Sequence, residues 1–149
     1  MNKKREGFTL VEVLIVVVIM AVLAATIVPQ FSDSSRDAKI STAQFNLSTL
    51  RGQIEMYKAQ HNSIVPALGT LEELTKKTDV GGTIGTTAGT HIYGPYIRVI
   101  PSNPLNASNT VTVITNSPAV AGDVTGTGGW LYNKTTGEVW IDHADHFTE

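Results

Sequence analysis

The chain has 149 residues, a formal net charge of −2, four histidines and no cysteine. The missing cysteines exclude a disulfide framework, a zinc–thiolate site and a cysteine nucleophile. Basic residues gather at the start, where residues 1–7 hold Lys3, Lys4 and Arg5 beside Glu6, and the remainder carries a net charge of −4. An acidic chain of this kind lacks the basic surface that nucleic-acid-binding proteins usually present.

A short hydrophilic leader, residues 1–7, runs directly into a long apolar segment. Residues 8–29 are rich in valine, isoleucine, leucine and alanine, and their single charged residue is Glu12. The 21 residues from position 8 to 28 would extend roughly 30 Å as a helix, about the thickness of a bilayer's hydrocarbon core. Because positive residues flank the N-terminal end, we expect that end to be cytoplasmic and the head to lie outside. The sequence therefore predicts a single membrane-spanning helix.

The most obvious processing point, between Gly7 and Phe8, lies before the apolar segment. A secretory signal peptide is cleaved after its apolar core, and the stretch Leu23-Ala24-Ala25 could supply such a cleavage site, which leaves that alternative open. Two features weigh against it: Glu12 interrupts the apolar core, and a helical pattern continues well beyond position 25. Cleavage after Gly7 would instead keep the helix on the mature protein.

Glu12 needs its own explanation, because an acid within a membrane segment is costly and is usually paired. Cleavage after Gly7 would create a positive amine on Phe8, four residues from Glu12. One interpretation is that Glu12 interacts with the N–H groups of the first turn of its own helix. The other is that Glu12 of one subunit meets the Phe8 amine of another subunit when helices bundle together.

With Gly7, Phe8, Glu12 and Pro29 at matching spacing, the first 30 residues or so resemble type IV pilins and type II secretion pseudopilins. The resemblance implies that a prepilin peptidase cuts after Gly7 and that the new Phe8 amine is methylated. It also implies that Phe8 and Glu12 take part in assembly, and that Pro29 kinks the helix near the membrane exit.

Residues 30–62 continue the helix in amphipathic form. Apolar residues recur at alternating steps of three and four, which is the pattern of one buried helical face. These residues are Ile40, Ala43, Leu47, Leu50, Ile54 and Tyr57. Since Pro66 disfavours further helix, we expect the helix to end near His61. The apolar stripe is expected to pack on a globular head, with a separate partner helix as the alternative.

The expected head, residues 63–149, combines short apolar runs with many turn residues. Residues 68–77 are consistent with a short second helix in which Thr70 and Glu73 form a capping box. Residues 111–115 alternate between apolar and polar side chains and predict a strand.

Two further strands are predicted near the C-terminus. Residues 130–132 and 138–141 flank a five-residue loop, which is a typical hairpin signal, and we expect Trp130 and Trp140 in the core of the sheet. The sequence as a whole predicts an α+β fold, in which a long N-terminal helix packs on a small antiparallel sheet.

Two further stretches, residues 46–58 and 94–104, are similar to the major pseudopilin branch of this class. That branch often carries a calcium loop near its C-terminus, rich in acids and glycine. The corresponding region here is the predicted hairpin at 130–141 with residues 142–146, which departs from that pattern. We therefore expect no cofactor, with calcium as the alternative.

Residues 142–146 form the one cluster that resembles a metal site, through Asp142, His143, Asp145 and His146. Imidazole and carboxylate suit zinc or another transition metal, whereas calcium takes six to eight oxygen ligands. Five consecutive residues near a terminus rarely converge on one ion. We therefore expect a solvated tail and no metal site.

These features predict a structural subunit and not an enzyme, since no Gly-x-Ser-x-Gly or His-Glu-x-x-His motif is present. The resemblance implies a precursor that polymerises from the bacterial inner membrane into a periplasmic pseudopilus and helps drive folded proteins through a type II secretion system. It implies as partners further copies of the chain, a prepilin peptidase, the inner-membrane assembly machinery and minor pseudopilins. The alternatives are a true type IV pilus subunit for adhesion, twitching or DNA uptake, and a membrane-anchored or secreted binding protein.

Overall fold

The computed structural model describes residues 7–148, except for the side chains of residues 26–32. Its helix and strands are α1 (Leu10–Gln60), β1 (Val111–Ile114), β2 (Trp130–Asn133) and β3 (Val139–Ile141), with short 3₁₀ turns η1 (Glu72–Leu74) and η2 (Ala121–Asp123). The chain forms two compact units, Met1–Ala38 and Lys39–Glu149. The α+β class and the helix end predicted near His61 are confirmed.

The first unit consists mainly of the N-terminal part of α1. The helix begins immediately after Thr9 and continues through position 29. The side chain of Pro29 lies outside the described part, so the kink predicted there stays a prediction. Residues 1–6 of the predicted leader also lie outside the described residues.

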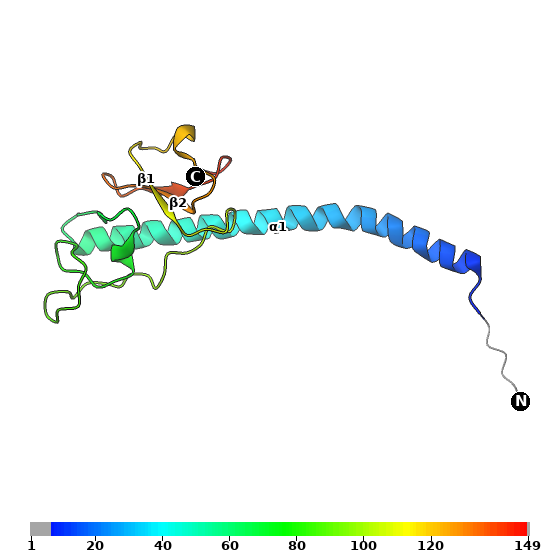
Figure 1. Cartoon of the computed structure of the whole chain (residues 1–149), viewed down its shortest axis with the longest axis horizontal. Coiled ribbons are helices and arrows are strands. Elements are labelled where there is room, and N and C mark those ends of the chain that lie inside the picture. The colour runs from blue at the N-terminus through cyan, green and yellow to red at the C-terminus, as the bar shows by residue number, and fades with distance from the viewer. Residues whose placement is uncertain (1–6, 149) are drawn as a thin grey trace, which may run out of the picture. The chain divides into compact units, whose positions relative to one another are not determined.

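The second unit is built around the C-terminal part of α1, drawn in cyan to green in Figure 1. Because the apolar residues of this part recur every three or four positions, they form one stripe along the helix. Five members of the predicted stripe are buried and Ile40 is half-buried. The five buried members pack against Leu71 and Leu74 from the connection after α1 and against side chains from β2 and β3. The stripe was therefore correctly predicted to pack on the head.

The sheet has the order β1–β2–β3 and mixes two kinds of pairing. β2 and β3 form the predicted antiparallel hairpin, with Trp130 opposite Ile141. β1 pairs with β2 in parallel, with Val111 opposite Trp130, so the prediction of an antiparallel sheet is wrong for this pair. The physical reason is the connection through residues 115–129, which is long enough to return the chain to the same end of the sheet.

Both faces of the sheet carry apolar side chains. Trp130, Tyr132 and Val139 lie in the cluster that contains the stripe of α1. Leu131 and Trp140 alternate with them and form a second cluster with Ile114 and Ala119. The burial of both tryptophans agrees with the prediction, and the indole N–H of Trp130 donates to the carbonyl of Pro101 at 2.8 Å.

The short helix predicted over residues 68–77 is reduced to the single turn η1, and its predicted cap is wrong. Leu71 precedes this turn in a left-handed conformation and no side chain caps it. Glu73 is buried, and its Oε1 accepts from the backbone N–H groups of Ala67 and Leu68 at 2.8 and 2.7 Å. The acid of the expected capping box therefore fixes the preceding loop and does not bond back to Thr70.

Candidate functional site

The beginning of α1 is organised by three hydrogen bonds that Thr9 and Glu12 exchange. The backbone N–H of Thr9 donates to Glu12 Oε2 at 2.7 Å, and the Thr9 hydroxyl donates to the same oxygen at 2.8 Å. In return, the backbone N–H of Glu12 donates to Thr9 Oγ1 at 3.2 Å. This is a capping box, and it satisfies N–H groups that the first turn of a helix leaves without an intrahelical acceptor.

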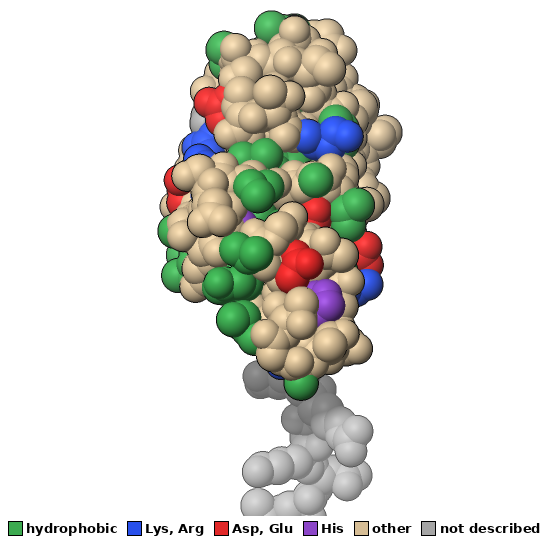
Figure 2. All heavy atoms as spheres, turned by 90° about the vertical axis from the view of Figure 1, so that its left-hand side faces the viewer, with side chains coloured by type: hydrophobic (Ala, Val, Ile, Leu, Met, Phe, Trp, Pro, Cys, Tyr) green, Lys and Arg blue, Asp and Glu red, His purple; other side chains and the backbone are tan. Residues whose placement is uncertain are grey.

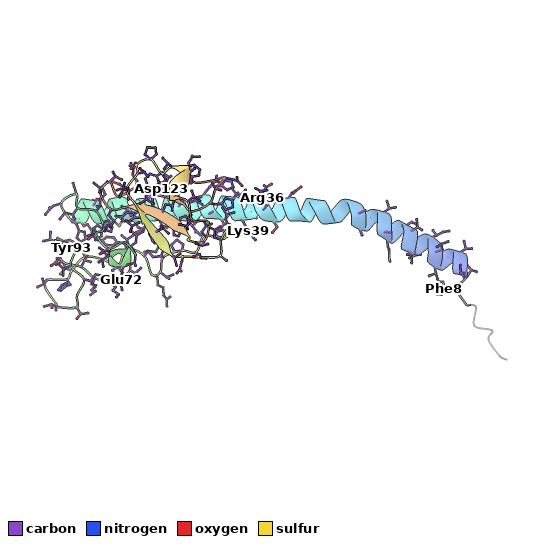
Figure 3. The ribbon with its side chains drawn as sticks, turned by 45° about the horizontal axis from the view of Figure 1, so that its top comes forward. Phe8, Arg36, Lys39, Glu72, Tyr93 and Asp123 are labelled. Atoms are coloured by element: carbon purple, nitrogen blue, oxygen red, sulfur yellow. The ribbon has the colours of Figure 1, made fainter. Side chains whose placement is uncertain are left out.

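Phe8 stands just before this first turn, where Figure 3 labels it, and its side chain is 90% exposed. Phe8 and Glu12 line a shallow hollow of about 270 Å³ together with Val13, Val16 and Val17. The structure thus brings Phe8 and Glu12 to one place, while Gly7 precedes them outside the helix. The two carboxylate oxygens of Glu12 differ in their hydrogen bonds, because Oε2 accepts both donors of Thr9.

An exposed apolar surface continues from this site along the first unit. Every valine, leucine, isoleucine and methionine from position 10 to 23 is exposed. An isolated water-soluble helix usually shows a polar face, whereas a helix that is apolar on all sides is buried in a larger assembly or in lipid. The exposed segment therefore needs a covering that this single chain does not supply.

Comparison with known proteins places this N-terminal arrangement in a wider class. The family described as the Prokaryotic N-terminal methylation motif matches residues 2–28. Over 82 residues, the chain is 30% identical to a fimbrial protein of Neisseria meningitidis serogroup A, a match that covers 55% of this chain and 48% of that protein. No solved structure matches the chain.

Longer matches decide the family. The chain is 35% identical over 76 residues to type II secretion system core protein G of Pseudomonas aeruginosa, covering 51% of this chain and 54% of that relative. It is 30% identical over 105 residues to core protein G of Aeromonas hydrophila, covering 70% of this chain and 71% of the relative. The chain belongs to the type II secretion system core protein G family. The resemblance to major pseudopilins inferred from residues 46–58 and 94–104 is thereby confirmed.

In the described part of this core protein G family member, no helix combines the length and apolar character needed to cross a membrane. The membrane span expected for residues 8–29 therefore stays a prediction. The cleavage after Gly7, the methylation of Phe8 and the pairing of Glu12 with another subunit also stay predictions, because they involve partners and chemistry outside the single chain.

The predicted solvated tail is wrong for Asp142. This residue is fully buried, while Asp145 is exposed and His143 and His146 are half-buried. The two imidazole rings lie 5.2 Å apart, and His143 Nδ1 accepts the backbone N–H of Asp145 at 3.2 Å. Among the described residues, no three acid or histidine side chains are placed to hold one metal ion. The four candidate ligands thus separate into a buried acid and a surface turn.

A buried polar cluster at the C-terminal end of α1 was not predicted from the sequence. The rings of Tyr57 and His61 stack with their centroids 3.8 Å apart. His61 Nδ1 lies 2.8 Å from the carbonyl of Tyr57, and its Nε2 lies 2.9 Å from the hydroxyl of Thr78. Because His61 follows Tyr57 by four positions, it continues the buried stripe, and this spacing is the signal that could have identified it.

A groove of about 740 Å³ lies between α1 and the β2–β3 hairpin, but its charged groups already have partners within the head. Arg51 donates from Nε and Nη2 to the carbonyl of Val139 at 3.2 and 3.0 Å. Lys58 pairs with Glu55 at 2.7 Å. Hydrogen bonds from Ser117 and Thr136 hold the pKa of Glu138 below its ordinary value. The groove is therefore a balanced polar surface and does not favour a ligand of either charge.

The face of the head that Figure 2 shows has no single chemical character. Hydrophobic side chains are distributed among polar and charged ones over this face. Exposed apolar residues of the segment after α1 include Ile64, Val80 and Ile92. Scattered apolar residues of this kind are normal on a protein surface, in contrast to the continuous apolar surface of the first unit.

Proposed function

We propose that the chain is the structural subunit of a pseudopilus, a periplasmic filament anchored in the bacterial inner membrane that helps drive folded proteins through a type II secretion system. Membership of the core protein G family and the methylation motif at residues 2–28 support this proposal. The observation that carries it in the structure is the exposed apolar surface of the first unit, which begins beside Phe8 and Glu12.

In the proposed mechanism, a prepilin peptidase cleaves after Gly7 and the new Phe8 amine is methylated. The apolar segments of many copies pack together into the filament core, which removes their exposed surface from lipid or water. Glu12 uses Oε2 to cap its own helix through Thr9 and Oε1 to accept the Phe8 amine of a neighbouring subunit. The heads form the outside of the filament, and the assembly machinery and minor pseudopilins act as partners.

A true type IV pilus subunit is the second candidate, and the similarity to a fimbrial protein favours it. The two filaments differ in length and location. Electron microscopy of cells that overproduce the chain distinguishes them, since a pilus extends as long surface fibres and a pseudopilus stays short. Long fibres that confer adhesion or twitching in cells without a type II secretion system would favour the second candidate.

Substitution of Glu12 tests the mechanism and separates its two roles. Glu12→Gln keeps a side chain that can complete a capping box but removes the negative charge, whereas Glu12→Ala removes both. Because a charge-assisted hydrogen bond contributes about 1.5–3 kcal/mol, we expect both variants to be inserted and cleaved but to reduce filament yield by about tenfold or more. Yield is measured by quantitative immunoblotting of sheared filament fractions.

The outcome for Glu12→Gln is decisive. Wild-type yield for Glu12→Gln with reduced yield for Glu12→Ala would show that Glu12 acts as a helix cap alone. Glu55→Ala, at an exposed acid elsewhere on α1, serves as the control and is expected to leave assembly unchanged.

A further inference from the structure

The carboxylate of Asp142 lies directly after β3 and is surrounded by hydrogen-bond donors. Oδ1 accepts the backbone N–H groups of Thr125 and Gly126 at 2.7 and 2.9 Å. Oδ2 accepts the backbone N–H of Gly128 at 2.9 Å and also the hydroxyl of Thr125. A carboxylate offers about four lone-pair positions, and four donors therefore saturate it.

The loop formed by residues 125–128 is shaped to bring its N–H groups onto this one side chain. Gly126 adopts a φ of +69°, a left-handed conformation that favours glycine. A Cβ atom on Gly128 would lie 2.5 Å from Asp142 Oδ2, so the close approach of the loop also requires glycine at that position. We name this arrangement the Asp142 cradle, meaning Asp142 with residues 125–128.

The cradle is also connected to the sheet and to the preceding loop. The backbone N–H of Asp142 donates to the carbonyl of Gly129, which directly precedes β2. Asn106 Nδ2 donates to the carbonyl of Gly128 at 2.7 Å and to that of Asp142. Asp142 therefore fixes three segments that are distant in the sequence: the end of β3, the loop before β2 and the connection before β1.

This geometry does not suit the calcium ion that the resemblance to major pseudopilins suggests for the C-terminal region. Calcium binds six to eight oxygen atoms, whereas the groups that face Asp142 are three backbone N–H groups and a hydroxyl directed at the carboxylate. A cation near Oδ1 or Oδ2 would have to displace these donors and would meet their positive ends.

Two other acids of the region each have hydrogen-bond donors of their own. Asp123, which Figure 3 labels in η2, accepts from Asn116 Nδ2 at 2.9 Å and from the backbone N–H of Val120 at 2.9 Å. Glu138 accepts from the hydroxyls of Ser117 and Thr136. Among the described residues, the acids of this region therefore do not converge on a point where they could hold one metal ion.

We infer that the Asp142 cradle does the structural work of a calcium loop, so that the head of this core protein G family member folds and holds its C-terminal region without a divalent cation. Backbone N–H groups that converge on an anion form a binding concavity, and here the anion is a side chain of the same chain. The inference concerns the stability of the head and is independent of how the first unit assembles.

The experiment compares thermal unfolding of the full chain, purified in detergent, in EDTA, in added Ca²⁺ and in added Mg²⁺. We expect the same Tm in all three conditions. Asp142→Asn replaces one acceptor oxygen with an NH₂ group that faces donors, and we expect it to lower Tm by about 4 °C or more in each condition. Asp145→Asn removes an exposed charge three residues away and is the matched control, with unchanged Tm.

A rise in the wild-type Tm with Ca²⁺, absent with Mg²⁺ and reversed by EDTA, would overturn the inference. Equal Tm values for Asp142→Asn and Asp145→Asn would also overturn it. If Asp142→Asn does not fold, the wild-type comparison still decides the role of calcium. Thr125→Val then tests the cradle, because it removes the one hydroxyl donor and is expected to lower Tm in EDTA and in Ca²⁺ alike.

Discussion

At the residue scale, two tyrosine side chains are buried between α1 and the sheet. Tyr57 and Tyr132 are almost fully buried, and the hydroxyl of Tyr132 donates to the carbonyl of Pro66 at 2.7 Å. Burial raises the pKa of Tyr57 to about 12, and the nearby Glu73 adds to this effect. The pKa of Tyr132 is raised for the same two reasons. The head therefore favours the neutral form of both phenols.

The raised pKa of Tyr57 predicts a loss of stability at alkaline pH. An unfolded tyrosine ionises near pH 10, so between pH 10 and about 12 the unfolded chain has released a proton that the folded chain still binds. The free energy of unfolding then falls as pH rises, by about 1.4 kcal/mol per pH unit for each such tyrosine. Urea unfolding of the detergent-purified chain across this pH range measures the slope.

Tyr57→Phe is the control, and it is expected to show a shallower fall than the wild type over the same range. A wild-type stability that stays constant or increases above pH 10 would contradict the prediction.

Glu12 and Asp142 each organise a local structure through hydrogen bonds, but only the hydrogen bonds of Glu12 could have been predicted from the sequence. Thr9 and Glu12 form the Thr-x-x-Glu pattern of a capping box, so their reciprocal hydrogen bonds could have been predicted from local spacing. Asp142 could not have been identified in this way, because its donors lie 14 to 17 residues earlier, in what reads as a flexible loop of threonine and glycine. Long-range contacts of this kind have no local signature.

At the scale of elements, the stripe of α1 determines how the head is assembled. Its members recur with the helical period, which is a purely local signal, and this is why the sequence predicted both the helix and its buried face. The parallel pairing of β1 with β2 was not predictable in the same way. Alternation identifies a strand, but it does not specify which direction a neighbouring strand runs after a long connection.

Truncation of the stripe should destabilise the head. Leu50 is fully buried in the cluster between α1 and the sheet. Leu50→Ala removes apolar contacts and leaves a cavity, so we expect the free energy of unfolding to fall by about 2–5 kcal/mol in urea titrations.

Phe45→Ala provides the matched control on the same helix. Phe45 is 72% exposed, and its truncation should change the stability of the isolated chain by about 0.5 kcal/mol or less. Equal effects of the two substitutions would show that the stripe does not hold α1 against the head.

At the scale of the whole molecule, the two units differ in what they leave exposed. The second unit buries most of its large apolar side chains in two clusters on the two faces of the sheet and exposes others singly. The first unit exposes the apolar side chains of positions 8–23, which a single copy of the chain does not cover. This contrast supports a subunit whose head folds by itself and whose N-terminal segment is completed by association with a membrane or with further copies.

The proposed function requires that the chain is a precursor whose apolar segment is retained after cleavage at Gly7. The most direct test is the intact mass of the protein isolated from its native host. The predicted mass corresponds to loss of residues 1–7 and gain of one methyl group, while a variant with Gly7→Ala should keep the leader. A mature chain that begins at Ala25 or Thr26 would contradict the claim, because it would identify the apolar segment as a discarded signal peptide.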